Sequence, residues 1–192
     1  YIRLGGLKLS DFFTFFRVLK NQCQTQNGVA LRGNYTLVNY FESEFIKWIY
    51  NISTIHKNSL TGDGIDCPQF VFTIVDIERN INILPACVID LWRQLVKDNP
   101  KIFENFISLS RVKANMVTRG TISLPHIKHI DQHNPHMVLI YYVNNCDGDT
   151  YIYDNDTYTS ISPEQGKYVI FDGALMHAGS SPVHSNHRIV IN

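Results

Sequence analysis

Residues 137–149 read MVLIYYVNNCDGD, and this stretch sets the character of the C-terminal part of the chain. An apolar and aromatic run over 137–143 is followed by a cluster of turn-forming residues, a pattern typical of a buried strand that ends in a tight turn. Similar short stretches, rich in β-branched and aromatic residues, recur at 150–153, 168–171 and 187–191, with turn-forming residues between them. Many short strands with regular turns favour a β-sandwich or a barrel, with the jelly roll as a common small version.

The first 110 residues have a different pattern and are predicted to be mostly helical. Apolar residues recur there at helical spacing, and cap signals precede two of the segments. The predicted helices are 12–19 behind Ser10, 41–52, 88–95, and a short one from Asn99-Pro100 to Phe106. The run 70–75 is better suited to a buried strand. Because no repeat or linker is visible, we expect 1–192 to form a single domain, with 1–110 as a mostly helical support region and 111–192 as the core.

The composition excludes several classes of protein. Hydrophobic residues make up 44% of the 192 positions and charged residues 18%, so the chain is not disordered. Lys+Arg and Asp+Glu are both 17, and this neutral balance argues against nucleic acid or an anionic membrane as partner. No apolar run has the length of a membrane span and no secretory signal is visible, so a cytoplasmic location is expected. The four cysteines are far apart and are expected to be reduced thiols.

The histidines are concentrated between residues 126 and 187, where seven of the eight lie. His129-Ile130-Asp131 is an H-x-D motif, and residues two apart on a strand point to the same face. His177 follows 46 residues after Asp131, on a predicted later strand. Two histidines and one carboxylate are the facial triad of non-haem Fe(II) oxygenases, which leaves coordination positions open for a 2-oxo acid and O2. H-x-D alone is weak, because a solvated loop pair also explains His129 and Asp131.

Arg188 strengthens the interpretation. It lies eleven residues after His177 across a loop-like segment, so we expect the two residues on adjacent antiparallel strands that face one cavity. A guanidinium there can make a bidentate, charge-assisted pair with the far carboxylate of a bound dicarboxylic acid. The competing interpretation of Arg188 is a surface ion pair.

Taken together, these motifs in 111–192 resemble the Fe(II)/2-oxoglutarate-dependent oxygenases. The segment is most similar to the prolyl-hydroxylase-like branch and to related oxygenases of bacteriophage and marine microbial genomes. The matching stretches are 129–131, 139–144, 147–150, 163–173 and 177–188. The resemblance implies an α+β, mainly β fold: a double-stranded β-helix, which is a jelly-roll or cupin-like barrel, with N-terminal helices packed on it. It also implies iron held by His129, Asp131 and His177, and 2-oxoglutarate held by Arg188.

Two further residues receive a role from this resemblance. Tyr142 falls where the family often has a tyrosine that reaches the co-substrate, although a core tyrosine explains it equally well. Asn115 lies on a plausible first barrel strand and is expected to face the co-substrate.

The sequence also departs from parts of the family's pattern. Collagen-type prolyl 4-hydroxylases have a lysine in place of Arg188, so hydroxylation of a collagen-like peptide is not supported. Asp149 replaces a second glycine of many members. Asp131 is retained, whereas halogenating relatives have a small residue there, so hydroxylation is favoured over halogenation.

The function expected from the resemblance is that of a dioxygenase. It would use Fe(II), 2-oxoglutarate and O2 to hydroxylate an unidentified protein side chain or small molecule, with release of succinate and CO2. The alternative is a non-catalytic jelly-roll module that binds a metal or a small acid. The sequence does not indicate the oligomeric state.

The remaining C-terminal histidines are expected to have ordinary roles. The crowding of His126, His133 and His136 could suggest a second metal site, but structural zinc sites prefer four nitrogen or sulfur ligands, and the segment is typical of a loop. His184 and His187 are expected at exposed loop or strand-edge positions, from which either could line a substrate entrance.

Overall fold

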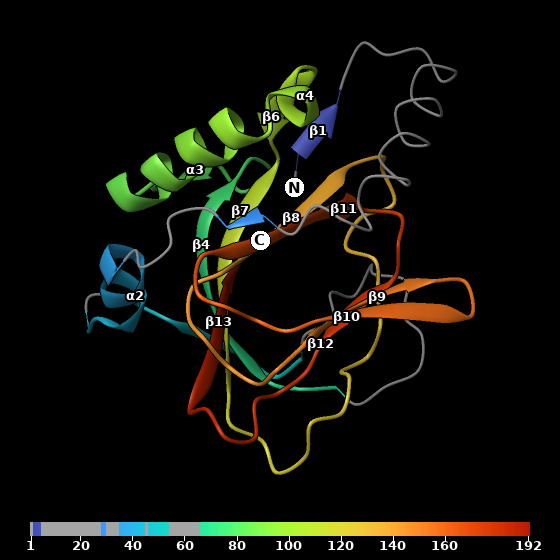
Figure 1. Cartoon of the computed structure of the whole chain (residues 1–192). Coiled ribbons are helices and arrows are strands. Elements are labelled where there is room, and N and C mark those ends of the chain that lie inside the picture. Colours follow the sequence, from blue (N-terminus) through green and yellow to red (C-terminus); the bar gives the residue numbers. More distant parts are fainter. Residues whose placement is uncertain (1, 5–27, 30–34, 45, 54–65) are drawn as a thin grey trace.

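The structure is a computed structural model, and it describes residues 2–4, 28–29, 35–44, 46–53 and 66–192. The described part is mostly β, with few helices (Figure 1). The helices are α2 (Tyr35–Glu42), α3 (Ala86–Asp98) and α4 (Pro100–Phe103). The strands are β1 (Ile2–Leu4), β2 (Gly28–Val29), β3 (Ile49–Asn51), β4 (Gln69–Asp76), β5 (Ile81–Asn82), β6 (Phe106–Leu109), β7 (Arg111–Thr118), β8 (Met137–Tyr142), β9 (Thr150–Asp154), β10 (Thr157–Ile161), β11 (Lys167–Asp172), β12 (His177–Gly179) and β13 (His187–Ile191).

The described strands form two antiparallel sheets. The main sheet has the order β2-β11-β8-β13-β7-β4-β3, with β1, β5 and β6 attached beside this path. The small sheet has the order β10-β9-β12. In Figure 1 the small sheet faces the main sheet across the interior of the molecule. Most neighbours along this path are not consecutive in the chain; the last strand, β13, pairs with both β7 and β8.

The two faces of the main sheet bury different side chains, because side chains alternate along each strand. On β13, Ile189 and Ile191 belong to the large apolar cluster that includes Leu91 and Leu95 of α3, so this is the outer face, covered by helices. Val190 belongs instead to a second buried cluster with Ile140 and other residues. That second, inner face looks toward the small sheet. The helices therefore cover the outer face of the main sheet, and the inner face lines the space between the two sheets.

Several sequence predictions are confirmed by these elements. The predicted helix at 88–95 is part of α3, and the apolar run 70–75 lies within β4. The predicted strands at 137–143, 150–153, 168–171 and 187–191 correspond to β8, β9, β11 and β13. Three cysteines in the described part, Cys67, Cys87 and Cys146, are free thiols.

Other predictions for the first 110 residues need correction. The expected helix at 41–52 is wrong: α2 ends at Glu42, where both the backbone N–H and the hydroxyl of Ser43 bond to the Tyr40 carbonyl. The chain then pairs as β3 with β4, which suits the β-branched and aromatic residues there. The short helix from residue 99 ends at Phe103, and Phe106 begins β6. The predicted helix at 12–19 lies outside the described residues.

The described part of the region before residue 111 contributes strands to the main sheet as well as helices. Strand β4 lies there, and it pairs along its length with β7 of the expected core. The division at residue 110 therefore separates two neighbouring strands of one sheet. The reason is that the apolar run of β4 indicates a strand but not its pairing partner, which lies more than thirty residues later.

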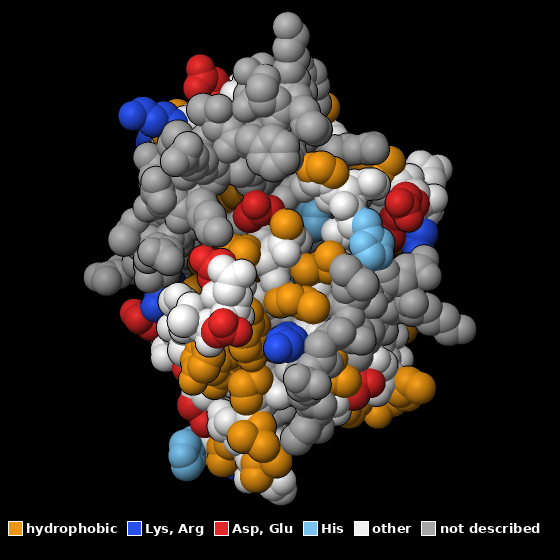
Figure 2. Space-filling view, turned by 90° about the vertical axis from the view of Figure 1, so that its right-hand side faces the viewer, with side chains coloured by type: hydrophobic (Ala, Val, Ile, Leu, Met, Phe, Trp, Pro, Cys, Tyr) orange, Lys and Arg blue, Asp and Glu red, His pale blue; other side chains and the backbone are white. Residues whose placement is uncertain are grey.

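The surface shows mixed side-chain types. On the face in Figure 2, which carries the small sheet, the described hydrophobic, acidic and basic side chains are interspersed, and the described Lys and Arg residues form no extended patch there. None of the helices described is long and apolar enough to cross a membrane.

The loop that leads into β13 is held by one carboxylate. Asp147 accepts hydrogen bonds from the backbone N–H groups of Val183, His184 and Ser185, at 2.8–2.9 Å. Burial acts to raise the pKa of the Asp147 carboxyl, but these hydrogen bonds outweigh it and lower the pKa below its ordinary value. The ionised carboxylate thus fixes the start of the strand that carries Arg188.

We expect Asp147→Asn to lower the Tm by about 2–4 °C at neutral pH, the shift that ~1 kcal/mol produces in a domain of this size. A group with a depressed folded-state pKa stabilises the protein above its unfolded pKa of about 3.9 and loses this effect as the pH falls further. The Tm difference from wild type should therefore shrink below about pH 4. Thermal unfolding followed by circular dichroism measures this, with Asp156→Asn in an exposed turn as control. Equal Tm values at pH 7 would contradict it.

Candidate metal centre

Two backbone hydrogen bonds bring the two histidines of the predicted triad together. The N–H of His129 donates to the carbonyl of His177 at 3.0 Å, and the N–H of His177 donates to the carbonyl of His129 at 2.9 Å. Residues paired in this way in antiparallel chains project their side chains to the same side. The two imidazole rings accordingly lie with their centroids 4.9 Å apart.

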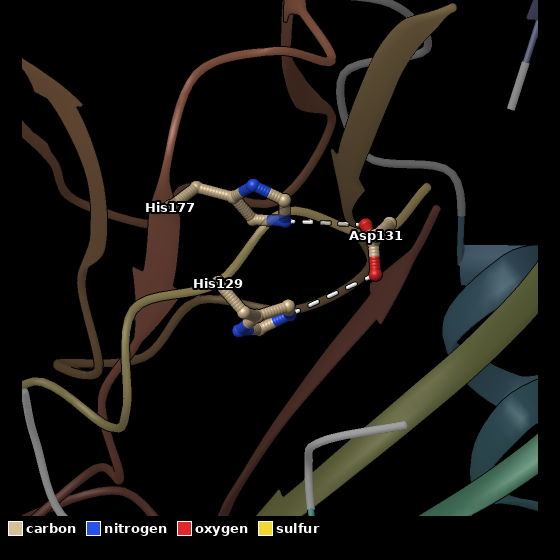
Figure 3. A group of neighbouring side chains, drawn as sticks. All are labelled: His129, Asp131 and His177. Carbon is tan, nitrogen blue, oxygen red and sulfur yellow. Dashed lines mark ion pairs between the residues drawn. The ribbon is translucent and has the colours of Figure 1, made fainter. Parts of the chain in front are cut away.

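Asp131 completes a compact group of three possible ligands (Figure 3). Its Oδ1 lies 3.7 Å from Nε2 of His129, and its Oδ2 lies 3.2 Å from Nε2 of His177. One ligand atom from each side chain falls within 4.8 Å of the others, close enough for one ion. Within the described ranges, this is the group of His, Cys, Asp and Glu side chains that meets this condition. The structure thus brings the three predicted residues together.

Backbone carbonyls orient both imidazoles for coordination. Nδ1 of His129 lies 3.0 Å from the carbonyl of Ile127, and Nδ1 of His177 lies 3.3 Å from that of Leu175. A carbonyl only accepts, so each Nδ1 carries a hydrogen in these contacts, and each Nε2, on the side of Asp131, is the nitrogen that a metal would use. Metal-binding histidines are typically fixed in this way. Burial and the nearby His177 also lower the pKa of His129, which favours the neutral form that a metal needs.

The carboxylate lies in positively charged surroundings. The Asp131 side chain is 8% exposed, and Nη2 of Arg111 lies 3.7 Å from its Oδ1. Burial would raise the pKa of the carboxyl, but His177, Lys113 and His129 lower it well below its ordinary value. Two neutral imidazoles and one carboxylate fit a divalent transition metal with open coordination positions. The donor set therefore suits the ion that the resemblance implies.

The three residues line a cavity of about 70 Å³ between the two sheets. The main sheet contributes Arg188 and Asn115 to its wall, and the small sheet contributes Thr150. The other lining residues are Gln69, Lys113, Val117, His126, Ile140, Ala178, Gly179, Val190 and Asn192.

Arg188 reaches this cavity from a different direction than predicted. The expectation of adjacent antiparallel strands for His177 and Arg188 is wrong, because β12 pairs with β9 whereas β13 pairs with β7 and β8. The two residues come from facing sheets, yet both line the same cavity. A loop between successive strands is compatible with either arrangement, so the sequence alone could not distinguish them.

The Arg188 guanidinium is buried and has no ion-pair partner in the described part of the chain. The residue is 5% exposed, and its Nη2 donates to Oγ1 of Thr150 at 2.7 Å. Its Nε has no hydrogen-bond partner among the described residues. A Cβ at Gly179 would lie 3.2 Å from Nη1, so a glycine there leaves the guanidinium its space. The surface ion pair that the sequence left open is therefore not what the structure has.

Tyr142 and Asn115 occupy different positions relative to the cavity. Tyr142 is fully buried and is not among the lining residues; its hydroxyl donates to Oγ1 of Thr150 at 2.8 Å. Its ring lies 5.9 Å from the Arg188 guanidinium. Asn115 lines the cavity and donates from Nδ2 to Oδ1 of Asn192 at 2.7 Å, while its own Oδ1 is buried without a described partner.

The other described histidines lie outside the metal-binding group. His126 is buried beside the cavity, with Nε2 3.1 Å from the Ser181 hydroxyl, and burial together with the Arg188 charge lowers its pKa to about 4. His136 is buried against Gly173, where any Cβ would meet the imidazole. His133 and His184 are exposed. His187 bonds to Oε1 of Glu42 at 2.8 Å, at the start of β13.

Sequence reasoning missed several polar residues of the cavity, among them Thr150 and Lys113. Thr150 is 1% exposed and accepts the bonds of both Arg188 and Tyr142, which only the tertiary fold reveals. Lys113 could have been predicted from the sequence, because it lies two residues before Asn115 on the same strand and its side chain therefore points to the same face.

The fold is similar to that of solved oxygenases. No protein-family model matches the chain, and no curated protein matches it. A prolyl hydroxylase from Trichoplax adhaerens, in complex with a peptide fragment of the hypoxia inducible factor oxygen degradation domain, has a TM-score of 0.58 at 14% identity, covering 96% of this chain and 92% of that one. A 2OG-Fe(II) oxygenase family oxidoreductase from Burkholderia pseudomallei has a TM-score of 0.58 at 12% identity, covering 98% and 91%. The resemblance to prolyl-hydroxylase-like oxygenases is thus confirmed at the level of the fold.

Replacing any one of His129, Asp131 and His177 by Ala is expected to lower the affinity for Mn(II) by at least ~100-fold, because each change removes a coordinate bond and even the loss of a residue that only orients a ligand costs about 10–100-fold. Calorimetric titration measures the affinity, and circular dichroism checks that the fold is kept. His184→Ala, which removes an exposed imidazole, serves as control. Retention of wild-type affinity by any of the three variants would remove that residue from the site.

Proposed function

We propose that this protein is an Fe(II)- and 2-oxoglutarate-dependent dioxygenase that hydroxylates its substrate and releases succinate and CO2. The observation that carries the proposal is the buried Arg188 guanidinium, which shares a cavity with the His-Asp-His group and has no carboxylate partner among the described residues. The fold similarity to 2-oxoglutarate oxygenases supports it. In this proposal the two facing sheets form a double-stranded β-helix, and residues 1–192 act as one domain.

The residues of the chain have distinct tasks in this reaction. His129, Asp131 and His177 hold the metal on one face and leave the opposite face open. Arg188 orients 2-oxoglutarate by binding its far carboxylate, so that the 2-oxo acid end meets the metal. When bound, Fe(II) and 2-oxoglutarate supply the O2-dependent oxidising chemistry that converts a C–H bond to C–OH. The sheets on both sides keep bulk water away from this chemistry.

Three further side chains support the co-substrate in this proposal. Thr150 accepts hydrogen bonds from Arg188 and Tyr142, which leaves its own hydroxyl hydrogen free to donate to the same far carboxylate. Tyr142 acts through Thr150, not by direct contact, since it does not line the cavity. Asn115 faces the cavity and can contact the 2-oxo acid end.

The substrate class is open to either a peptide or a small molecule. The Trichoplax adhaerens protein of the same fold is in complex with a peptide, so a protein side chain is one class to test. The neutral composition disfavours nucleic acid. The remaining alternative function is a non-catalytic module of the same fold that binds a metal or a small acid.

Turnover separates the two functions. Under air with added Fe(II), the wild-type protein is expected to form succinate from 2-oxoglutarate, even without its substrate at a slow uncoupled rate. Asp131→Ala should form none above background, because it lacks the anionic ligand. Succinate is quantified by NMR over time, and the exposed-residue variant His184→Ala is the matched control. Metal and 2-oxoglutarate binding without any succinate, in the presence of peptide and metabolite panels, would favour the binding module.

Arg188→Met is expected to weaken 2-oxoglutarate binding by roughly one and a half to four decades, because a carboxylate left buried without its charged partner costs about 2–5 kcal/mol. Metal affinity should be unchanged, since no metal ligand is touched. The affinity is measured by titrating 2-oxoglutarate into anaerobic Fe(II) protein and following the charge-transfer absorption of the chelate.

Two further variants calibrate this result. Arg188→Lys should be milder than Arg188→Met, because the charge stays and only the fork geometry is lost. Arg93→Met, which removes an exposed arginine paired with Asp90, should behave as wild type. An unchanged affinity in Arg188→Met would refute the role assigned to Arg188.

A further inference from the structure

A second cation lines the cavity at a distance from Arg188. Lys113 lies on β7 and pairs with Asn192, the residue after β13, through two backbone hydrogen bonds of 2.8 and 2.9 Å. Arg188 pairs with Val117, four residues further along β7. At about 3.3 Å per residue, the Lys113–Asn192 pair and the Arg188–Val117 pair are roughly 13 Å apart along β7. Lys113 and Arg188 therefore approach the cavity from opposite ends of its main-sheet wall.

The triad lies toward the Lys113 end of the cavity, because Nη2 of Arg111, two residues before Lys113 on β7, lies 3.7 Å from Oδ1 of Asp131. Asp131 is the carboxylate that attracts the Lys113 charge, whereas the charge of Arg188 acts on His126. With 2-oxoglutarate extending from Arg188 to the metal, as in the proposed function, Lys113 remains on the far side. A group bound there would adjoin the metal without overlapping the far-carboxylate subsite.

The Lys113 ammonium has no partner of its own. In the described part of the chain its Nζ makes no hydrogen bond and no ion pair, although charged groups that line a protein interior are normally paired. Burial lowers the pKa of Lys113 to about 8, with Asp131 opposing the effect, so the cationic form still predominates at neutral pH. A cation in a cavity wall with unused donors is suited to an anionic ligand.

The net charge of the cavity with metal and 2-oxoglutarate bound also favours an anionic ligand. Its described ionised lining residues are Lys113, Arg188 and Asp131, which leave one net positive charge. A divalent metal and the dianion 2-oxoglutarate cancel each other. The loaded site therefore attracts one more negative charge, and the low polarity of its surroundings strengthens this attraction.

We propose that Lys113 binds a carboxylate of the primary substrate beside the metal, so that the enzyme selects substrates with a carboxylate close to the carbon that is hydroxylated. The inference rests on the proposed function for the position of 2-oxoglutarate. A small carboxylic acid and an acidic side chain of a peptide share this chemistry. The small acid is tested first, and the peptide side chain forms a second arm of the experiment.

The test uses Mn(II)-loaded protein saturated with 2-oxoglutarate and the probe propionate, with neutral propionamide as its twin. Line broadening of the probe methyl protons by Mn(II) reports binding next to the metal. In wild type, propionate should broaden saturably and bind at least tenfold more tightly than propionamide. Lys113→Met should abolish this preference, and Lys113→Arg should largely restore it. A second pair of probes, blocked aspartate and blocked asparagine, represents a peptide side chain. Tighter binding of the acid than of the amide in either pair supports the proposal.

Control variants establish whether the preference depends on Lys113 itself. Lys167→Met removes a lysine paired with Glu164 outside the cavity and should behave as wild type. Lys113→Gln serves as a second neutral variant if Lys113→Met fails to fold by circular dichroism. The affinity for 2-oxoglutarate should fall at least tenfold less in the Lys113 variants than in Arg188→Met, because Lys113 makes no contact with the far carboxylate.

Three results would overturn the proposal: no preference for either acid in wild type, an unchanged preference in the neutral variants, or a loss of 2-oxoglutarate affinity like that of Arg188→Met. The last result would assign Lys113 to the co-substrate. If wild type binds Mn(II) but not 2-oxoglutarate, the proposed function fails, and the propionate arm with Mn(II) alone still decides the role of Lys113.

Discussion

The reciprocal backbone hydrogen bonds between His129 and His177 are the constraint on which the site depends. They join the segment after β7 to strand β12 and set both imidazoles on the same side. Asp131, two residues along, then reaches both rings. No described helix contributes a side chain to the metal-binding group, and α3 packs on the outer face of the main sheet. The geometry of the metal-binding group is therefore set by the pairing of residue 129 with β12, and the facing main sheet contributes Arg188 to the cavity.

The cavity brings positive charge into the interior at a cost in stability. Arg188 is buried with one described hydrogen-bond acceptor, and such a charge is expensive unless it is paired. Thr150 and the ring of Tyr142 offset part of this cost. An anionic ligand would offset more, so binding and stability are coupled here in the way that ligand linkage requires. A site of this kind is arranged for its ligand more than for the stability of the free protein.

The sequence predicted the parts of the molecule whose signals are local. The strands β8, β11 and β13 follow from short apolar runs between turn residues, and the triad follows from residue types at a spacing that one ion requires. The conformation of 46–52 was mispredicted because an apolar stripe of that length fits a helix as well as a strand that pairs with β4. Thr150 was missed because its importance comes from Arg188 and Tyr142, which are distant in sequence. The sheet to which β12 belongs is likewise a property of pairing, which spacing does not encode.

A crystal structure of the protein with Mn(II) and 2-oxoglutarate is the most direct test of the central claim. The account predicts Mn(II) bound by Nε2 of His129, Nε2 of His177 and a carboxylate oxygen of Asp131. It also predicts the far carboxylate of 2-oxoglutarate within hydrogen-bond distance of the Arg188 guanidinium. A metal bound elsewhere, or a 2-oxoglutarate whose far carboxylate lies away from Arg188, would contradict it.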